Sequence, residues 1–149
     1  METTAITTKS FYSPSLGDIE YEEEQVVIFP SGLIGFEELV SFVLYEREEM
    51  RPFVCMVSIE EPAIYFPLLD PRIIDQEYGS ENLLSELKSL GITRPNDAFL
   101  FCIVTIGKDI SQVTVNLRGP LIINPKRMVG RQIILIDSKY MVQHPLSLL

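Results

Sequence analysis

Histidine and cysteine are the side chains best suited to nucleophilic or metal chemistry, and this chain has few of them. His144 is the only histidine, and it precedes Pro145 in a short C-terminal segment. Any imidazole-based triad would have to use it, so a tail histidine without a catalytic role is the simpler interpretation. Cys55 and Cys102 lie in apolar, strand-like stretches, which favour buried structural thiols over nucleophiles. One histidine and two cysteines cannot complete a standard structural zinc site, and we expect no bound metal or cofactor.

Carboxylates are abundant, with 21 acidic side chains against 12 basic ones and a net charge of −9. Two of them could act as general acid and base, so a small acidic carboxylate-dependent enzyme stays open as an alternative. Glu22, Glu23 and Glu24 form a run whose simplest interpretation is a solvated face. Its second interpretation is electrostatic, since such a run adds to a negative field that attracts a basic partner. Asp70 precedes a proline, where an Asx-type turn explains it without catalysis.

Two features that could bind phosphate are weak. Residues 32–35 lack the Gly-Lys-Ser/Thr ending of a phosphate loop, and no long helix is expected after them. A tight turn in which glycine supplies a positive φ is the better interpretation. Lys126, Arg127 and Arg131 form a basic cluster whose first interpretation is a solvated loop and whose second is a contact for an acidic patch on a partner. The negative charge of the whole chain also disfavours direct nucleic-acid binding, which needs a basic face.

The 149 residues, 46% of them hydrophobic, are enough for one sizeable core. Residues 1–75 hold 15 acidic and 4 basic side chains, whereas residues 76–149 hold 6 and 8, yet apolar runs continue through the midpoint. We therefore interpret residues 1–149 as a single polarised domain whose extreme termini are candidates for disorder. The longest apolar run, residues 98–104, is far shorter than the roughly 20 residues of a membrane helix, and no signal peptide is visible. These features predict a cytoplasmic protein that does not bind membranes.

The sequence pattern predicts strands over most of the chain. Residues 98–106 are the most apolar stretch and predict a central strand buried on both faces. Val113, Val115 and Leu117 alternate with polar residues, so residues 112–117 predict a half-buried strand. Pro67 lies inside the strand expected at residues 64–69 and predicts an edge strand or a bulge there. The remaining strands are expected at residues 25–29, 40–45, 53–59, 121–123 and 132–136.

One clear α-helix is expected at about residues 80–90. Ser80 is a suitable N-cap, Gly91 is placed for the left-handed residue beyond the C-terminus, and Pro95 prevents the helix from resuming. Four leucines share one face: Leu83, Leu84, Leu87 and Leu90. A helical turn at residues 36–39 is a further, short option. Many short strands with frequent glycine and proline turns predict a mainly β, single-domain fold, either a small antiparallel barrel or a sandwich.

The most distinctive stretch is residues 114–125, Thr-Val-Asn-Leu-Arg-Gly-Pro-Leu-Ile-Ile-Asn-Pro. Its pattern predicts a strand, a break at Gly119 and Pro120, a second short strand and an Asn-Pro turn. Gly119 could form a bulge that directs the following residues outward. Pro120 has no backbone N–H to donate, so we expect it at a sheet edge.

This stretch resembles the flagellar assembly factor family, FliW. Residues 29–37, Phe-Pro-Ser-Gly-Leu-Ile-Gly-Phe-Glu, resemble the Gly-Ile-Pro-Gly-Phe turn near the N-terminus of that family. Residues 132–135 and the later Tyr140 resemble its C-terminal strand and tail. The three segments occur in the family's order, and the likeness covers nearly the whole chain. Ile34 stands where proline is expected and Gly119 where alanine is common.

The resemblance implies a single-domain, β-barrel-like protein without catalysis. Members of the family bind flagellin in the cytoplasm and, alternatively, the carbon storage regulator CsrA, a small RNA-binding repressor of flagellin translation. Accumulating flagellin occupies the factor and frees the repressor, so translation stops by partner switching. The matched motif indicates an interaction edge for the regulator, formed by Asn116, Pro120, Leu121 and Asn124. The acids Glu22, Glu23 and Glu24 are the electrostatic candidates.

Two other classes of protein stay open from the residues alone. One is the carboxylate-dependent enzyme, against which the absence of tryptophan and the single histidine count weakly. The other is a structural subunit of a larger assembly whose exposed strand edges are covered by neighbours. Identification of the proteins bound to this chain in a cytoplasmic pull-down would discriminate among the three.

Overall fold

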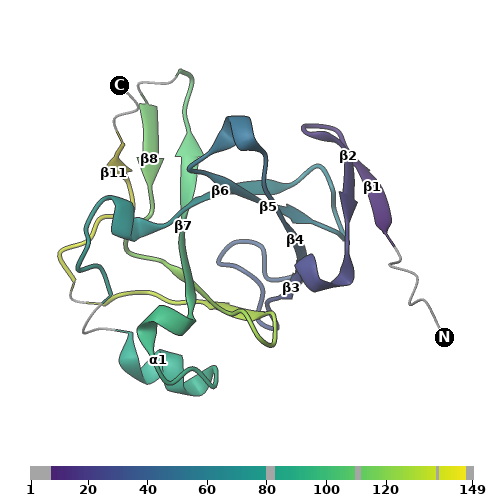
Figure 1. Ribbon diagram of the computed structural model, residues 1–149. Helices are drawn as coiled ribbons and strands as arrows, with labels where there is room; N and C mark the ends of the chain where they lie inside the picture. The colour runs from purple at the N-terminus through teal and green to yellow at the C-terminus, as the bar shows by residue number, and fades with distance from the viewer. Residues whose placement is uncertain (1–7, 80–82, 110–111, 137, 147–149) are drawn as a thin grey trace.

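The structure is a computed structural model that describes residues 8–79, 83–109, 112–136 and 138–146. Within these residues, seven strands pair in a closed ring (Figure 1). Around the ring they are β7 (Phe99–Ile106), β6 (Tyr65–Leu69), β5 (Val54–Ser58), β4 (Ser41–Tyr45), β3 (Val26–Ile28), β10 (Val129–Gln132) and β9 (Leu121–Asn124). All pairs are antiparallel except β3 with β10. The mainly β, barrel-like fold predicted from the sequence is therefore confirmed, with one parallel pair added.

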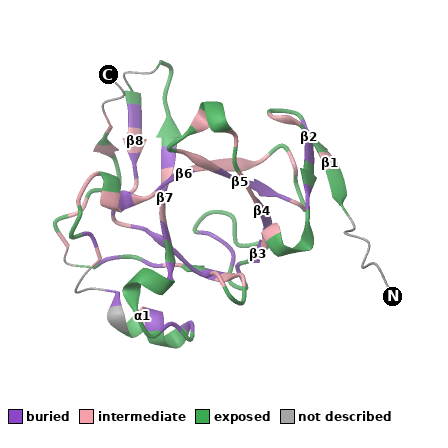
Figure 2. Ribbon diagram, viewed as in Figure 1, coloured by how far each residue is buried: buried purple, intermediate pink, exposed green. Residues whose placement is uncertain are grey.

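Four further strands lie outside the ring. β8 (Val113–Val115) and β11 (His144–Pro145) extend the sheet from β7, whereas β1 (Lys9–Ser13) and β2 (Gly17–Tyr21) form a separate hairpin. The hairpin stands on the opposite side of the barrel from β8 and β11 (Figure 1). Sequence analysis missed the hairpin, because only Ser13, Ile19 and Tyr21 are buried and most other positions face solvent (Figure 2).

Apolar side chains fill the barrel and two flanking layers. The barrel interior contains Val27, Phe29, Phe42, Met56, Leu68, Leu121 and Ile123. A larger cluster connects the helix, β7 and β8, and a small one lies under the hairpin. Burial of each such side chain contributes about 1.5–3 kcal/mol to folding, so this core determines the register of the ring.

The central strand β7 is not buried on both faces as predicted. Leu100, Cys102 and Val104 point into the core, but Phe99 and Ile106 are exposed. On the opposite face, Phe101 and Ile103 are half-buried and pack against the barrel interior. Both faces of β7 therefore contact other elements, and residues toward its two ends line the two clefts described below.

Pro67 lies in an interior strand, which corrects the prediction of an edge. β6 pairs with β5 at Pro67, but its pairing with β7 begins only at Leu68. A residue without an N–H is tolerated there, since no ladder partner faces it on the β7 side. The strand predicted at residues 132–136 is also displaced, because β10 ends at Gln132. Residues 133–135 continue along the loop before β9, where Ile133 N–H donates to the Pro120 carbonyl at 2.9 Å.

The expected helix is present as α1 (Leu84–Ser89), and its C-terminus is as predicted. Gly91 has φ +76°, its N–H donates to the Lys88 carbonyl, and Ile92 N–H donates to the Leu87 carbonyl. This is a Schellman motif, which satisfies the last carbonyls of the helix. Pro95 opens a 3-10 helix instead of prolonging α1. The predicted N-cap, Ser80, lies outside the described residues, as do the extreme termini.

Short 3-10 helices complete the described part: η1 (Glu23–Gln25), η2 (Glu48–Met50), η3 (Pro71–Ile73) and η4 (Pro95–Asp97). Residues 36–39 form turns and no helix. None of the helices in the described ranges has the length and hydropathy needed to span a bilayer.

Candidate functional site

Asn116, the first of the predicted site residues, organises the loop between β8 and β9. Its side-chain Oδ1 accepts hydrogen bonds from Arg118 N–H at 3.1 Å and Gly119 N–H at 2.9 Å. A Cβ added at Gly119 would lie 2.9 Å from the Asn116 amide and 3.2 Å from the Gln132 amide. Glycine therefore allows both amides to close over the loop, while Asn116 itself stays half-buried.

Pro120 and Leu121 do not form the exposed edge that the sequence predicted. Pro120 is buried, and Leu121 has no exposed surface. The reason is that β9 pairs with β10 on one side and β7 on the other, so closure of the barrel leaves it without an edge. The predicted outward turn after Gly119 is wrong for the same reason. A direct regulator contact at these two residues remains a prediction.

Asn124 is 5% exposed and links two elements. Its Nδ2 donates to the Leu90 carbonyl at 2.8 Å, while its Oδ1 accepts from Lys126 N–H at 3.0 Å. The side chain thus ties the end of α1 to the turn between β9 and β10. A buried amide with its donor and acceptor both used is a structural group in this state.

The acidic run Glu22, Glu23 and Glu24 is exposed at η1. Glu23 pairs with the Lys9 ammonium group of the hairpin, and Glu22 N–H donates to the Gln25 side chain. Glu24 makes neither contact and borders a cleft that is considered further below. The electrostatic role of the run is still a prediction; within the described residues, Glu23 is the member of the run that forms an ion pair.

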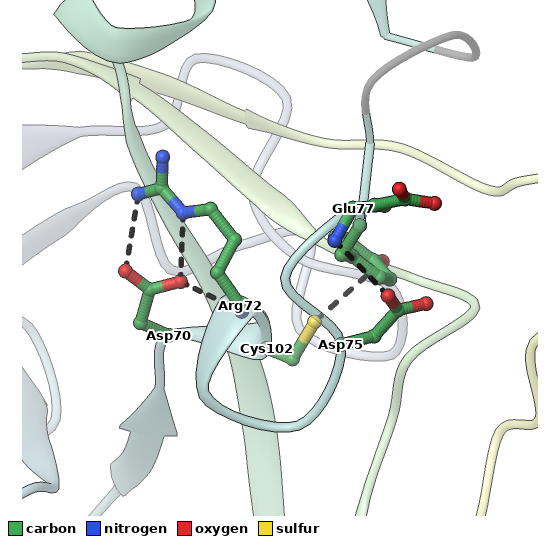
Figure 3. A network of polar contacts seen from close by, with 6 residues as sticks. Asp70, Arg72, Asp75, Glu77 and Cys102 are labelled. Atoms are coloured by element: carbon green, nitrogen blue, oxygen red, sulfur yellow. Dashed lines mark hydrogen bonds and ion pairs between the residues drawn. The ribbon is translucent and has the colours of Figure 1, made fainter.

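The two cysteines and Asp70 have structural roles in the fold. Both cysteines are buried free thiols, and burial raises the pKa of Cys102 to about 12, which keeps it protonated and unreactive. Cys102 contacts the Tyr78 hydroxyl at 3.7 Å, which in turn donates to the Leu117 carbonyl. Asp70 accepts from Arg72 N–H at 2.9 Å and pairs with its guanidinium, as the Asx-turn interpretation predicted (Figure 3).

An apolar groove of about 700 Å³ is open on the surface of the described residues. We call it the apolar groove. It runs from the turn at residues 33–36, along β6 and β7, to the C-terminal tail. Its exposed apolar side chains are Ile34, Phe36, Ile106, Ile134 and Val142, and its polar members include Asn116, Gln132 and Gln143.

The wall of the groove is held by glycine geometry and by one glutamine. Gly32 and Gly35 have φ of +67° and +88°, and a Cβ at Gly32 would lie 2.6 Å from the Glu37 backbone. The tight turn predicted from these glycines is therefore confirmed. Gln132 accepts from Ile34 N–H at 2.9 Å and donates to the Gly119 carbonyl at 3.0 Å. It thus joins the two segments that carried the family resemblance.

Exposed apolar side chains in one groove indicate a protein contact surface. Ile34, Ile106 and Val142 are 59%, 61% and 56% exposed, although isoleucine and valine are usually buried. Sequence analysis did not select them, since a single apolar residue in a turn or tail has no period that reveals its exposure. The nearest signal was the glycine pair around Ile34.

Comparison with known proteins identifies this arrangement. The family described as FliW protein matches residues 10–146. The chain belongs to the FliW family. A flagellar assembly factor FliW of Natranaerobius thermophilus is 38% identical over 135 residues, which cover 90% of this chain and 89% of the relative. One of Clostridium botulinum strain Langeland is 40% identical over 130 residues, covering 87% and 91%.

A solved structure agrees with the fold of this FliW protein. The crystal structure of the flagellar assembly factor FliW superposes with a TM-score of 0.81 at 32% identity, over 92% of this chain and 96% of that one. The family resemblance drawn from residues 29–37, 114–125 and 132–140 is thereby confirmed. The protein is a flagellar assembly factor by family.

Proposed function

We propose that this FliW protein binds flagellin in the cytoplasm through the apolar groove and, alternatively, binds the carbon storage regulator CsrA. Binding of flagellin would free the regulator, and the regulator would then repress flagellin translation. The observation that supports the proposal best is the row of exposed apolar side chains in the groove of a flagellar assembly factor. No covalent step is part of the proposal, because competition governed by mass action is sufficient.

The groove suits a partner segment with one apolar face. Phe36 packs edge-on against Phe66 with ring centroids 5.1 Å apart, and the two rings line the groove together with Ile134 and Val142. An amphipathic helix could place its apolar side chains against these residues. The polar amides of Asn116 and Gln132 at the base could accept or donate hydrogen bonds to the bound segment.

For the regulator, the four motif residues have two different proposed roles. Asn116 lines the groove, so it keeps its proposed role as a direct contact. Pro120, Leu121 and Asn124 would act through the fold, because Pro120 and Leu121 are buried where the chain after Asn116 enters β9, and Asn124 ties α1 to the β9–β10 turn. This division makes the proposal testable with separate measurements of stability and affinity.

The test uses purified full-length protein, flagellin and CsrA in pairwise calorimetric titrations, followed by competition. We expect each partner to bind alone and flagellin to lower the apparent affinity for CsrA in proportion to its concentration. If both partners bind at once without affecting one another, the switch is wrong. If flagellin does not bind at all, the groove has another occupant.

A further inference from the structure

A second cleft, which we call the acidic cleft, combines an apolar floor with a carboxylate rim. It measures about 570 Å³ and lies between β2, η1 and β4 on one side and β7 and the β9–β10 turn on the other. Its floor is formed by Leu44, Val54, Phe99, Phe101 and Met128, and its rim by Glu20, Glu24 and Glu46. The acidic cleft and the apolar groove share no lining residue, although β7 contributes lining residues to both.

The floor provides a socket for a bulky apolar side chain. Phe99 is 43% exposed, and its ring centroid lies 6.4 Å from that of Phe101. Phe101 and Met128 are half-buried, so the socket is formed by side chains that the core already holds in place. Covering exposed aromatic surface of this kind is a typical source of binding energy at interface centres.

The rim carries negative charge that is not neutralised within the described part of the chain. There, Glu20, Glu24 and Glu46 are exposed and form neither an ion pair nor a side-chain hydrogen bond. Three carboxylates around an apolar socket attract cations from solution, and the field of the acidic N-terminal half adds to theirs.

Two cations in segments that flank the cleft, Arg47 and Lys9, are held by other groups. The Arg47 guanidinium donates to the Leu16 carbonyl at 2.7 Å and to the Tyr45 hydroxyl at 3.0 Å. The Lys9 ammonium group pairs with Glu23, and the Arg127 guanidinium lies over Gly91. The rim therefore offers its three charges to an external ligand.

We propose that the acidic cleft docks a basic segment of a partner protein, in which lysine or arginine side chains surround one bulky apolar side chain. The cations would meet Glu20, Glu24 and Glu46, and the apolar side chain would cover Phe99. Charge complementarity selects such a segment over an anionic or purely apolar one. The identity of the partner rests on the proposed function, because the RNA-binding regulator is the basic member of the two proposed partners.

If the two partners bind mainly at different surfaces, competition for one shared site does not explain why they exclude one another. The apolar groove has no aspartate or glutamate among its lining residues, so it offers no comparable attraction for a basic segment. A regulator whose basic segment lies in the acidic cleft would therefore reach the groove only at its proposed contact with Asn116, and would leave the exposed apolar side chains of the groove uncovered. Exclusion would then arise from overlap of the bound proteins or from a shift of β7, whose two halves line the two sites.

The test compares two triple variants of equal charge change in the full chain. E20Q/E24Q/E46Q removes the three negative charges of the rim, whereas E38Q/E61Q/E77Q removes three negative charges from exposed side chains outside the cleft. The probes are purified CsrA and a short labelled peptide of alternating lysine and leucine. At low salt we expect the rim variant to lose about tenfold in affinity for both probes, mostly in the association rate, and the control variant about twofold or less. Added salt should reduce the difference between them.

Phe99→Ala provides a second, uncharged test. It should weaken both probes about fivefold without changing the salt dependence, because it removes apolar contact only. Equal losses for the two triple variants would overturn the inference, since the overall field would then explain the attraction. If CsrA binds none of the proteins, the proposed function fails in that part, and the peptide alone decides whether the cleft binds basic segments.

Discussion

The motif segment at residues 116–124 and the apolar groove use their residues in opposite ways. The motif segment has the most distinctive sequence, yet Pro120, Leu121 and Asn124 are buried. The groove is formed by ordinary apolar residues, and side chains such as Ile34 and Val142 are exposed. The unusual residues of the motif segment serve the local backbone geometry. The candidate contact surface, in contrast, consists of ordinary apolar side chains that stay exposed in the folded protein.

Barrel closure is the physical cause of this difference. The backbone N–H and C=O groups of a loop that enters a closed ring need hydrogen-bond partners within the protein. The side-chain amides of Asn116 and Asn124 supply such partners, and Gly119 allows the Asn116 amide to approach closely. The groove runs past the same ring, and its apolar side chains Ile34, Phe36, Ile106, Ile134 and Val142 remain exposed there. Variants in the two regions should therefore separate stability from binding.

The largest effect is expected for Leu121→Ala. Leu121 is fully buried in the barrel interior, so the variant should lose about 2–5 kcal/mol of unfolding free energy through lost burial and a cavity. The matched control is Ile134→Ala in the groove, which is 46% exposed and should change stability by about 0.5–1 kcal/mol. Chemical denaturation of both variants measures the difference. Similar losses for the two would erase the distinction between the regions.

Asn124→Ala should have the second largest effect. It leaves the Leu90 carbonyl and the backbone N–H of Lys126 without their partner, at a cost of about 1–3 kcal/mol. Thermal unfolding measures the loss, and calorimetry with the regulator measures binding by the folded fraction. If the variant melts normally but binds the regulator poorly, Asn124 contacts the regulator directly, and the contrast between the motif segment and the groove is wrong.

Local rules in the sequence predicted the elements well, and tertiary closure explains the errors. Gly91 ends α1 and Gly32 makes a turn because both rely on backbone geometry that glycine alone permits. Pro67 and Pro120 were assigned to edges by an equally local rule, but the ring gives neither an edge. Exposure of the groove could not be predicted, since it depends on which faces the whole fold leaves uncovered.

Ile34→Ser and Val142→Ser test the apolar groove, where binding and not stability should change. Each should weaken flagellin binding by about 1–2 kcal/mol, the usual scale for a useful interface side chain, with stability changed by about 0.5 kcal/mol or less. Ile73→Ser is the matched control, because Ile73 is 60% exposed but lies outside the groove. The three affinities come from calorimetric titration with flagellin. Equal weakening by Ile73→Ser would mean that general surface hydrophobicity, and not the groove, is responsible.

The smallest effect is expected for Tyr140→Phe, in the tail that carried part of the family resemblance. The Tyr140 hydroxyl donates to Asp75 Oδ2 at 2.7 Å, and its ring lies 4.6 Å from the ring of Tyr78. The hydrogen bond from Tyr140, followed by one from the Glu77 backbone, lowers the pKa of Asp75. Burial and the same hydrogen bond raise the pKa of Tyr140 to about 12. Tyr140→Phe keeps the ring and removes only the hydroxyl, so its melting temperature should fall slightly near neutral pH.

The pH dependence of that difference distinguishes the hydrogen bond from ring packing. Because the folded-state pKa of Asp75 is lowered, its contribution is present above the unfolded value of about 3.9 and is lost as the pH falls through the lower folded value. Because the folded-state pKa of Tyr140 is raised, its contribution is present below about 10 and is lost as the pH rises toward the folded value. The gap in melting temperature between the natural chain and Tyr140→Phe should thus be widest from about pH 5 to 9 and shrink on both sides. A gap that stays constant into acid would contradict this prediction, because the hydroxyl would then act independently of the Asp75 carboxylate. The absence of a gap at every pH would show that ring packing alone holds the tail.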